Sequence, residues 1–144
     1  MKWTEEMIRE EIKRLDAVTG LNGQKLPIRM GRAKTEVGSL VLLDKEPVCF
    51  RFSRCFFEHP DFARKSAVET IRHEYAHYMD VCRRGTSRHD KQWEDCCFII
   101  GLIPEREFSP LMNMIYLANE RGVSVVDVAL KGVPFAAKKN TPAA

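Results

Sequence analysis

The sequence lacks several features that define common classes of protein. Its five cysteines include no C-x-x-C pair and are odd in number, which argues against both a ribbon-type zinc site and a disulfide framework. No apolar run approaches the roughly 18 residues that a membrane helix requires. The first residues alternate charged and apolar side chains, unlike a secretory signal. We therefore expect a cytoplasmic protein with no membrane partner.

A strong charge imbalance is also missing, since the formal net charge of the 144 residues is only +3. With 44% hydrophobic and 30% charged residues, the composition predicts one packed globular domain. Positive side chains nevertheless gather in one short stretch, and such a cluster is able to contact nucleic-acid phosphates or an acidic substrate. Cations near a helix C-terminus are also common on an ordinary solvated surface. The cluster consists of Arg83, Arg84, Arg88 and Lys91.

Hydrophobic periodicity predicts an α+β fold. A first helix should begin at Thr4 and end near Gly20, followed by three short strands that form a small, mostly antiparallel sheet. The apolar spacing then becomes helical, which predicts a helix over about 61–82 that stops near Gly85. A further helix is expected from Ser87 or Arg88 to about residue 101. The three strands are expected within LPIRMGRA, GSLVLLD and PVCFRFS.

Residues 1–103 are predicted to form the core of the domain. Residues 104–137 are expected to add a helical extension that packs on the same domain, with one helix starting at Ser109 and Pro110 and stopping at Gly122. Residues 138–144 are predicted to be a flexible tail.

The stretch HEYAH carries the clearest chemical signal. His73 and His77 are four residues apart, so on a helix they stand side by side, opposite an apolar stripe that includes Tyr75 and Tyr78. Two adjacent imidazoles suit two corners of a zinc tetrahedron. Glu74 flanks them and is placed to take a proton from a zinc-activated water. The pattern therefore predicts a Zn²⁺ site with Glu74 as the catalytic residue.

A catalytic zinc usually has three protein ligands, so a third must come from elsewhere. His89 is the best candidate, because the helix can finish, turn at Gly85 and bring the first turn of the next helix back across the metal. Asp90 and Glu94 remain alternatives, whereas Cys82 is expected to point with the core. Asp80 lies one turn beyond His77 and is a candidate to orient a ligand imidazole.

These motifs resemble the SprT-like zinc metallopeptidase domain, which is also found in Spartan proteases. The similarity covers roughly residues 5–100 and rests on HEYAH, on the later RHDKQW, and on VCFRFSRCFF leading into SAVETIRHEYAH. The family pattern has glycines in a strand pair, a strand ending in a polar residue, the His-Glu-x-x-His helix, and a third histidine followed four residues later by an aromatic. The corresponding residues here are Gly31, Gly38, Ser53, His73, Glu74, His77, His89 and Trp93.

The resemblance implies a zincin-like fold and zinc-dependent hydrolysis of peptide bonds in a protein or peptide substrate. Two features depart from it: Asp90 stands where the family commonly has glycine, and no cysteine-rich zinc ribbon follows the domain. The alternative function is a zinc-stabilised, non-catalytic module that recruits DNA or a protein partner through the Arg83 to Lys91 cluster.

Overall fold

A computed structural model of the chain describes residues 2–104 and residue 122. It contains helices and one small sheet, which confirms the predicted α+β class. Apart from residues 104 and 122, the predicted C-terminal extension and the tail lie outside the described residues. In chain order the elements are α1 (Glu5–Thr19), η1 (Gly23–Lys25), β1 (Ile28–Gly31), β2 (Gly38–Leu43), β3 (Glu46–Ser53), α2 (Arg54–Phe57), α3 (Arg64–Arg84) and α4 (Lys91–Ile99).

The sheet has the strand order β1-β3-β2, so the last strand lies between the first two. β2 and β3 form an antiparallel hairpin, whose turn residues Asp44 and Lys45 have φ values of 51° and 66°. β1 pairs with β3 in parallel, with Ile28 opposite Phe50. The prediction of a mostly antiparallel sheet is therefore wrong for the pairing of β1. After β1 the chain crosses to the far edge of the sheet before β3 returns between the two strands.

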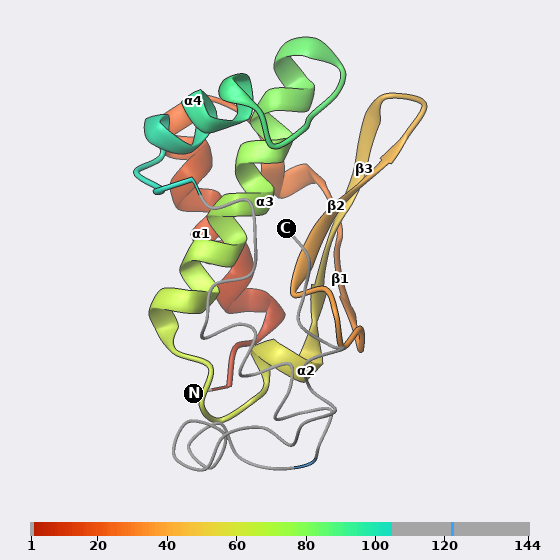
Figure 1. Cartoon of the computed structure of the whole chain (residues 1–144), viewed down its shortest axis with the longest axis vertical. Helices are drawn as coiled ribbons and strands as arrows, with labels where there is room; N and C mark the ends of the chain where they lie inside the picture. The colour runs from red at the N-terminus through yellow and green to blue at the C-terminus, as the bar shows by residue number, and fades with distance from the viewer. Residues whose placement is uncertain (1, 105–121, 123–144) are drawn as a thin grey trace, which may run out of the picture.

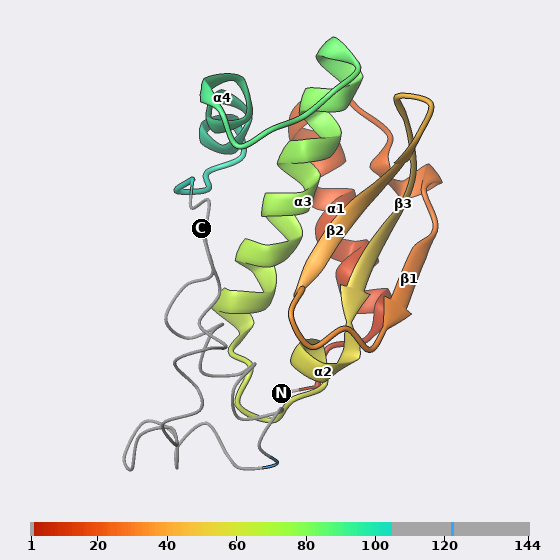
Figure 2. The same cartoon turned by 45° about the vertical axis from the view of Figure 1, so that its right-hand side comes forward.

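The sheet packs against α1 and α3, and α4 crosses the C-terminal part of α3 (Figures 1 and 2). The core between these layers is strongly aromatic: the Phe50 ring lies 5.8 Å from Tyr78, and the Phe52 ring lies 5.1 Å from Phe57. Helix α3 is thus covered by α1, by the sheet and by α4. It is the element from which a buried or half-buried site can be built.

A buried polar contact ties α3 to α1. The Tyr75 hydroxyl donates to Asp16 at 2.6 Å, and the same carboxylate accepts from the Gly23 amide at 2.7 Å. Burial and this bond to Asp16 raise the pKa of Tyr75. Because Tyr75 and Tyr78 both face the core, as predicted, the rotation of α3 about its axis is fixed.

Capping residues set the ends of the helices α3 and α4. Helix α3 ends at Arg84, and Gly85, with φ of 76°, is its C-cap, which confirms the predicted stop. The next helix begins at Lys91, because Asp90 is its N-cap and accepts from the Trp93 amide at 3.3 Å. Residues 85–90 therefore form a loop. The short helix α2 was not predicted; Ser53 caps it by accepting from the Cys55 amide.

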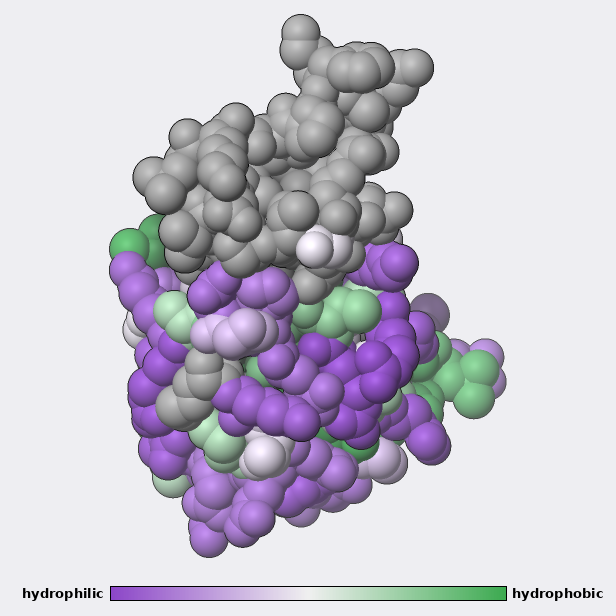
Figure 3. Space-filling view, turned by 90° about the horizontal axis from the view of Figure 1, so that it is seen from below, coloured by the Kyte–Doolittle hydropathy of each residue, from purple (hydrophilic) through white to green (hydrophobic). Residues whose placement is uncertain are grey.

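Within residues 2–104, no helix combines the length and the apolar character needed to cross a membrane. The face seen in Figure 3 is mainly hydrophilic where it is described, and hydrophobic residues appear there in smaller areas. This agrees with a core that holds most of the large apolar side chains.

Candidate metal centre

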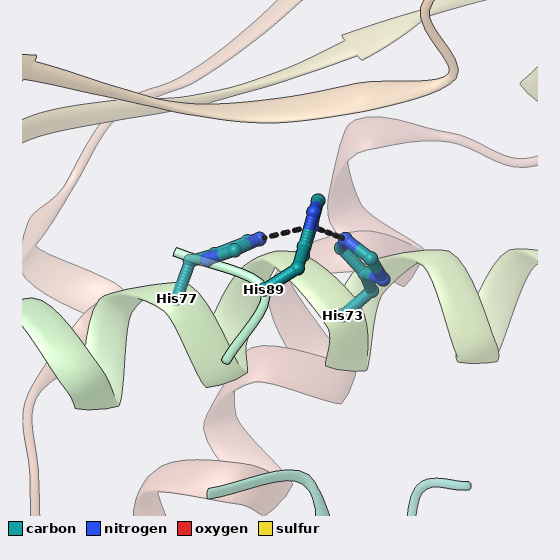
Figure 4. A group of neighbouring side chains, drawn as sticks. All are labelled: His73, His77 and His89. Atoms are coloured by element: carbon teal, nitrogen blue, oxygen red, sulfur yellow. Dashed lines mark hydrogen bonds between the residues drawn. The ribbon is translucent and has the colours of Figure 1, made fainter. Parts of the chain in front are cut away.

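Three histidines converge on one point beside α3. His73 and His77 project from neighbouring turns of α3, and His89 reaches them from the loop that follows (Figure 4). The Nε2 atom of His89 lies 3.2 Å from Nε2 of His73 and 3.1 Å from Nε2 of His77. The same nitrogen of each ring is therefore directed at a common centre.

This spacing fits a tetrahedral zinc ion. With Zn–N bonds of about 2.0–2.1 Å, two ligand nitrogens of a tetrahedron are roughly 3.3 Å apart. Among residues 2–104, the ligand atoms of His73, His77 and His89 form a group of metal-binding type, all within 4.8 Å of one another. The structure thus brings together the three predicted ligands.

His89 reaches the site from a loop, so its predicted position in the first turn of a helix is wrong. The loop is held against α3 by Ser87, whose Oγ lies 2.6 Å from Nδ1 of His77. When Nδ1 donates to this hydroxyl, Nε2 keeps the lone pair that a metal requires. Ser87, which was predicted only as a possible helix start, orients His77.

Asp80, the predicted candidate to orient a ligand imidazole, is bonded to Arg84 through both carboxylate oxygens. It is fully buried and accepts two hydrogen bonds from Arg84, each 2.7 Å long. Arg84 also donates to both carboxylate oxygens of Asp90, at 2.8 and 3.0 Å. Asp80 thus anchors Arg84 at the end of α3, and Arg84 in turn reaches the N-cap of α4.

Trp93 forms the wall behind the imidazoles and is fully buried. Its ring is stacked on His77, with centroids 5.2 Å apart and an interplanar angle of 22°, and it meets His73 and His89 edge-on at 4.8 Å each. These ring contacts give a structural role to the aromatic residue Trp93, four positions after His89. The indole restricts the rings to the orientation in which their Nε2 atoms converge.

The environment favours neutral imidazoles. Burial, followed by the other histidines, lowers the pKa of His73 from 6.5 to about 3. Burial and His89 lower that of His77 to about 4, although Asp90 acts in the opposite direction. Metal ligation requires the neutral form of histidine. Both α3 histidines are therefore held in the protonation state that binds a metal.

Glu74 lies beside this centre and is buried against the sheet. Its Oε2 atom is 3.9 Å from Nε2 of His73, and its carboxylate accepts a hydrogen bond from the backbone of Leu40 in β2. Burial, with a smaller effect of the Glu36 charge, raises the pKa of Glu74 to about 8 despite that bond. Positive charge bound at the histidines would act in the opposite direction and favour the carboxylate.

Gly38 lets β2 approach Glu74 closely. A Cβ atom on Gly38 would lie 2.8 Å from Cδ1 of Phe52 and 3.3 Å from Cγ of Glu74. The two predicted strand glycines therefore differ, because a Cβ on Gly31 would meet nothing within 4 Å. A pocket of about 170 Å³ begins beside Gly38. Its lining residues are Gly31, Arg32, Ala33, Glu36, Gly38, Arg51, Phe52 and Ser53.

The alternative third ligands are not part of the group of three histidines. Asp90 is occupied by Arg84 and by the cap of α4. Glu94 lies on α4 and is not in the group, which is formed by the histidines alone among the described residues. Cys82 is exposed, so its predicted orientation toward the core is wrong.

The cationic cluster is smaller than the sequence suggests. Arg84 pairs with Asp80 and Asp90, and Lys91 lies 3.3 Å from Asp95. Arg83 and Arg88 are exposed, and neither forms an ion pair within residues 2–104. Arg83 and Arg88 are thus the members of the cluster that a nucleic acid or an acidic substrate would meet without an ion-pair partner among the described residues.

Sequence reasoning missed Ser87, the double pairing of Arg84, and the contact between Gly38 and Glu74. The available signals were weak, because a serine, an arginine and a glycine are common in loops, helix ends and strands. No family model matches this sequence. No curated protein and no solved structure matches it either.

Proposed function

We propose that this protein is a zinc-dependent peptidase in which His73, His77 and His89 bind the metal and Glu74 transfers protons. The observation that carries the proposal is the convergence of three imidazole nitrogens beside one buried carboxylate. A structural zinc is usually closed by four protein ligands, whereas a catalytic zinc has three and an open position. The group found within residues 2–104 has three members, which supports a catalytic site.

When bound, zinc would supply a Lewis acid that polarises the scissile carbonyl and lowers the pKa of an attacking water. The protein's own residues have separate tasks. Ser87 and Trp93 orient the imidazoles, so that each ring presents Nε2. Glu74, in its carboxylate form, accepts the proton of the water and then delivers it to the departing amine.

An extended polypeptide is the substrate that best suits the surroundings of Glu74. β2 is an edge strand and packs against α3, and its Leu40 backbone is bonded to the Glu74 carboxylate. The unpaired edge of a strand binds extended chains through main-chain hydrogen bonds. A peptide that binds along β2 would thus be brought to the catalytic group.

The test compares zinc content and proteolysis in the wild type and in Glu74→Gln. Glutamine keeps the size of the side chain and removes its basicity, so zinc should remain while cleavage of casein falls by about 10²–10⁴-fold. Glu69→Gln is the control, because it makes the same chemical change on the same helix. The Glu69 carboxylate lies 3.8 Å from Lys65 and is not part of the metal centre. It should keep both zinc and activity. Unchanged cleavage by zinc-loaded Glu74→Gln would refute the proposal.

The alternative is a zinc-stabilised binding module that recruits DNA or a protein. The exposed side chains of Arg83 and Arg88 are the observation in its favour. It would be supported by salt-sensitive DNA binding that survives Glu74→Gln and disappears when both arginines are replaced by glutamine.

A zincin-like arrangement related to the SprT-like domain belongs to the same proposal. Its support is the order of the motifs along the chain: a strand pair, a helix with His73 and His77, and then His89 with Trp93.

A further inference from the structure

Arg84 connects the last turn of α3 to the residue that follows His89. Its Nε and Nη2 atoms each donate to one oxygen of Asp80 at 2.7 Å, and Nη2 also donates to the Asp90 oxygens at 2.8 and 3.0 Å. Asp80 is completely buried, so its carboxylate is a fixed anchor for the guanidinium. Asp90 in turn caps α4.

Two side-chain contacts tie the loop that carries His89 to α3. The loop spans residues 85–90, and its contacts to α3 include the Ser87 bond to His77 and the Asp90 bonds to Arg84. His89 lies between these two anchors and is exposed, so burial in the core does not hold it. The Trp93 ring, which meets His89 at 4.8 Å, itself depends on where α4 begins. The position of His89 should therefore be sensitive to both anchors.

We infer that Arg84 is a positioning residue for the third metal ligand, acting through Asp90. This inference rests on the proposed zinc site. A planar guanidinium can donate to two carboxylates in fixed directions, whereas a lysine ammonium is a single point of charge on a flexible stem. The role of Arg84 is thus to support the metal centre, and it does not contribute a free cation to the cationic cluster.

The main test is Asp90→Ser, because serine preserves the N-cap of α4 while it removes the charged partner of Arg84. Zinc affinity is measured by competition with a chromogenic chelator, and the melting temperature of the zinc-free protein is measured separately. We expect zinc affinity to fall about tenfold, at the lower end of the range for residues that orient metal ligands. The melting temperature of the zinc-free protein should change little. A purely structural role would alter the melting temperature and leave the affinity unchanged.

A second variant, Arg84→Lys, tests the other side of the same contact. Lysine keeps a positive charge beside the buried Asp80, so the protein should fold, but it lacks the second arm that reaches Asp90. Zinc affinity should again fall about tenfold. The double variant should bind zinc about as well as either single variant, because both changes remove the same contact between Arg84 and Asp90. Arg83→Lys is the matched control, since Arg83 is the preceding residue and forms no ion pair among the described residues.

The outcomes separate this inference from the proposed function. If the wild type binds zinc and both folded variants bind it within twofold of the wild type, the positioning role is wrong and the zinc site stands. If the wild type binds no zinc, the metal site is wrong and the inference fails with it. If the zinc-loaded wild type cleaves no casein while the zinc affinities are ordered as expected, only the peptidase proposal is contradicted.

Discussion

Replacing Gly38 by alanine should destabilise the protein, because this glycine makes room for two neighbours at once. The new Cβ would lie 2.8 and 3.0 Å from Cδ1 and Cε1 of Phe52, closer than carbon atoms normally approach. Phe52 is buried between other aromatic rings, with Phe57 at 5.1 Å and Phe50 at 6.4 Å, and has little freedom to move. Overpacking of this kind costs about 1–3 kcal/mol.

For a domain of this size, the loss corresponds to roughly 4 °C of melting temperature per kcal/mol. Gly31→Ala is the matched control: it also lies in a strand, and its Cβ would meet nothing within 4 Å. That variant should be as stable as the wild type or slightly more stable. Urea unfolding with both variants gives the difference in free energy of unfolding.

Gly38→Ala should also affect the site, since its Cβ would lie 3.3 Å from Cγ of Glu74. Displacement of this carboxylate should lower proteolysis in zinc-loaded protein more than it lowers zinc affinity, because the three ligand histidines do not contact β2 through Gly38. If Gly38→Ala and Gly31→Ala unfold at the same urea concentration as the wild type, the close packing of β2 on Phe52 and Glu74 is not present in solution.

Two further substitutions test how the metal centre is supported. Ser87→Ala removes the 2.6 Å contact with Nδ1 of His77. Zinc affinity, measured by chelator competition, should fall by about tenfold, while the melting temperature of the zinc-free protein changes little. An affinity equal to that of the wild type would show that Ser87 does not orient the ring. Tyr75→Phe removes the hydroxyl bonded to Asp16 and Thr19, so urea unfolding should show a loss of about 1–3 kcal/mol, and a stability equal to the wild type would contradict the tie between α1 and α3.

The sequence by itself determined the parts of the protein that depend on local spacing. Helical period puts His73 and His77 on neighbouring turns, and the capping residues Thr4 and Gly85 mark where α1 begins and α3 ends. Short runs rich in branched and aromatic residues located the strands. The predicted third ligand, His89, also joined the other two. These features follow from interactions between residues less than about twenty positions apart.

Only the tertiary structure decided the features that depend on distant segments meeting. The parallel pairing of β1 with β3 follows from the insertion of β3 between two earlier strands, which no local pattern encodes. Asp80 points toward Arg84 rather than toward His77, because the buried carboxylate is stabilised by a cation that also reaches Asp90. Glu74 owes its raised pKa to burial against β2, some thirty residues earlier in the chain. Burial and charge pairing act between residues that are distant in the sequence. The spacing of residues therefore predicts which side chains form this site, but it does not predict which other side chains they contact.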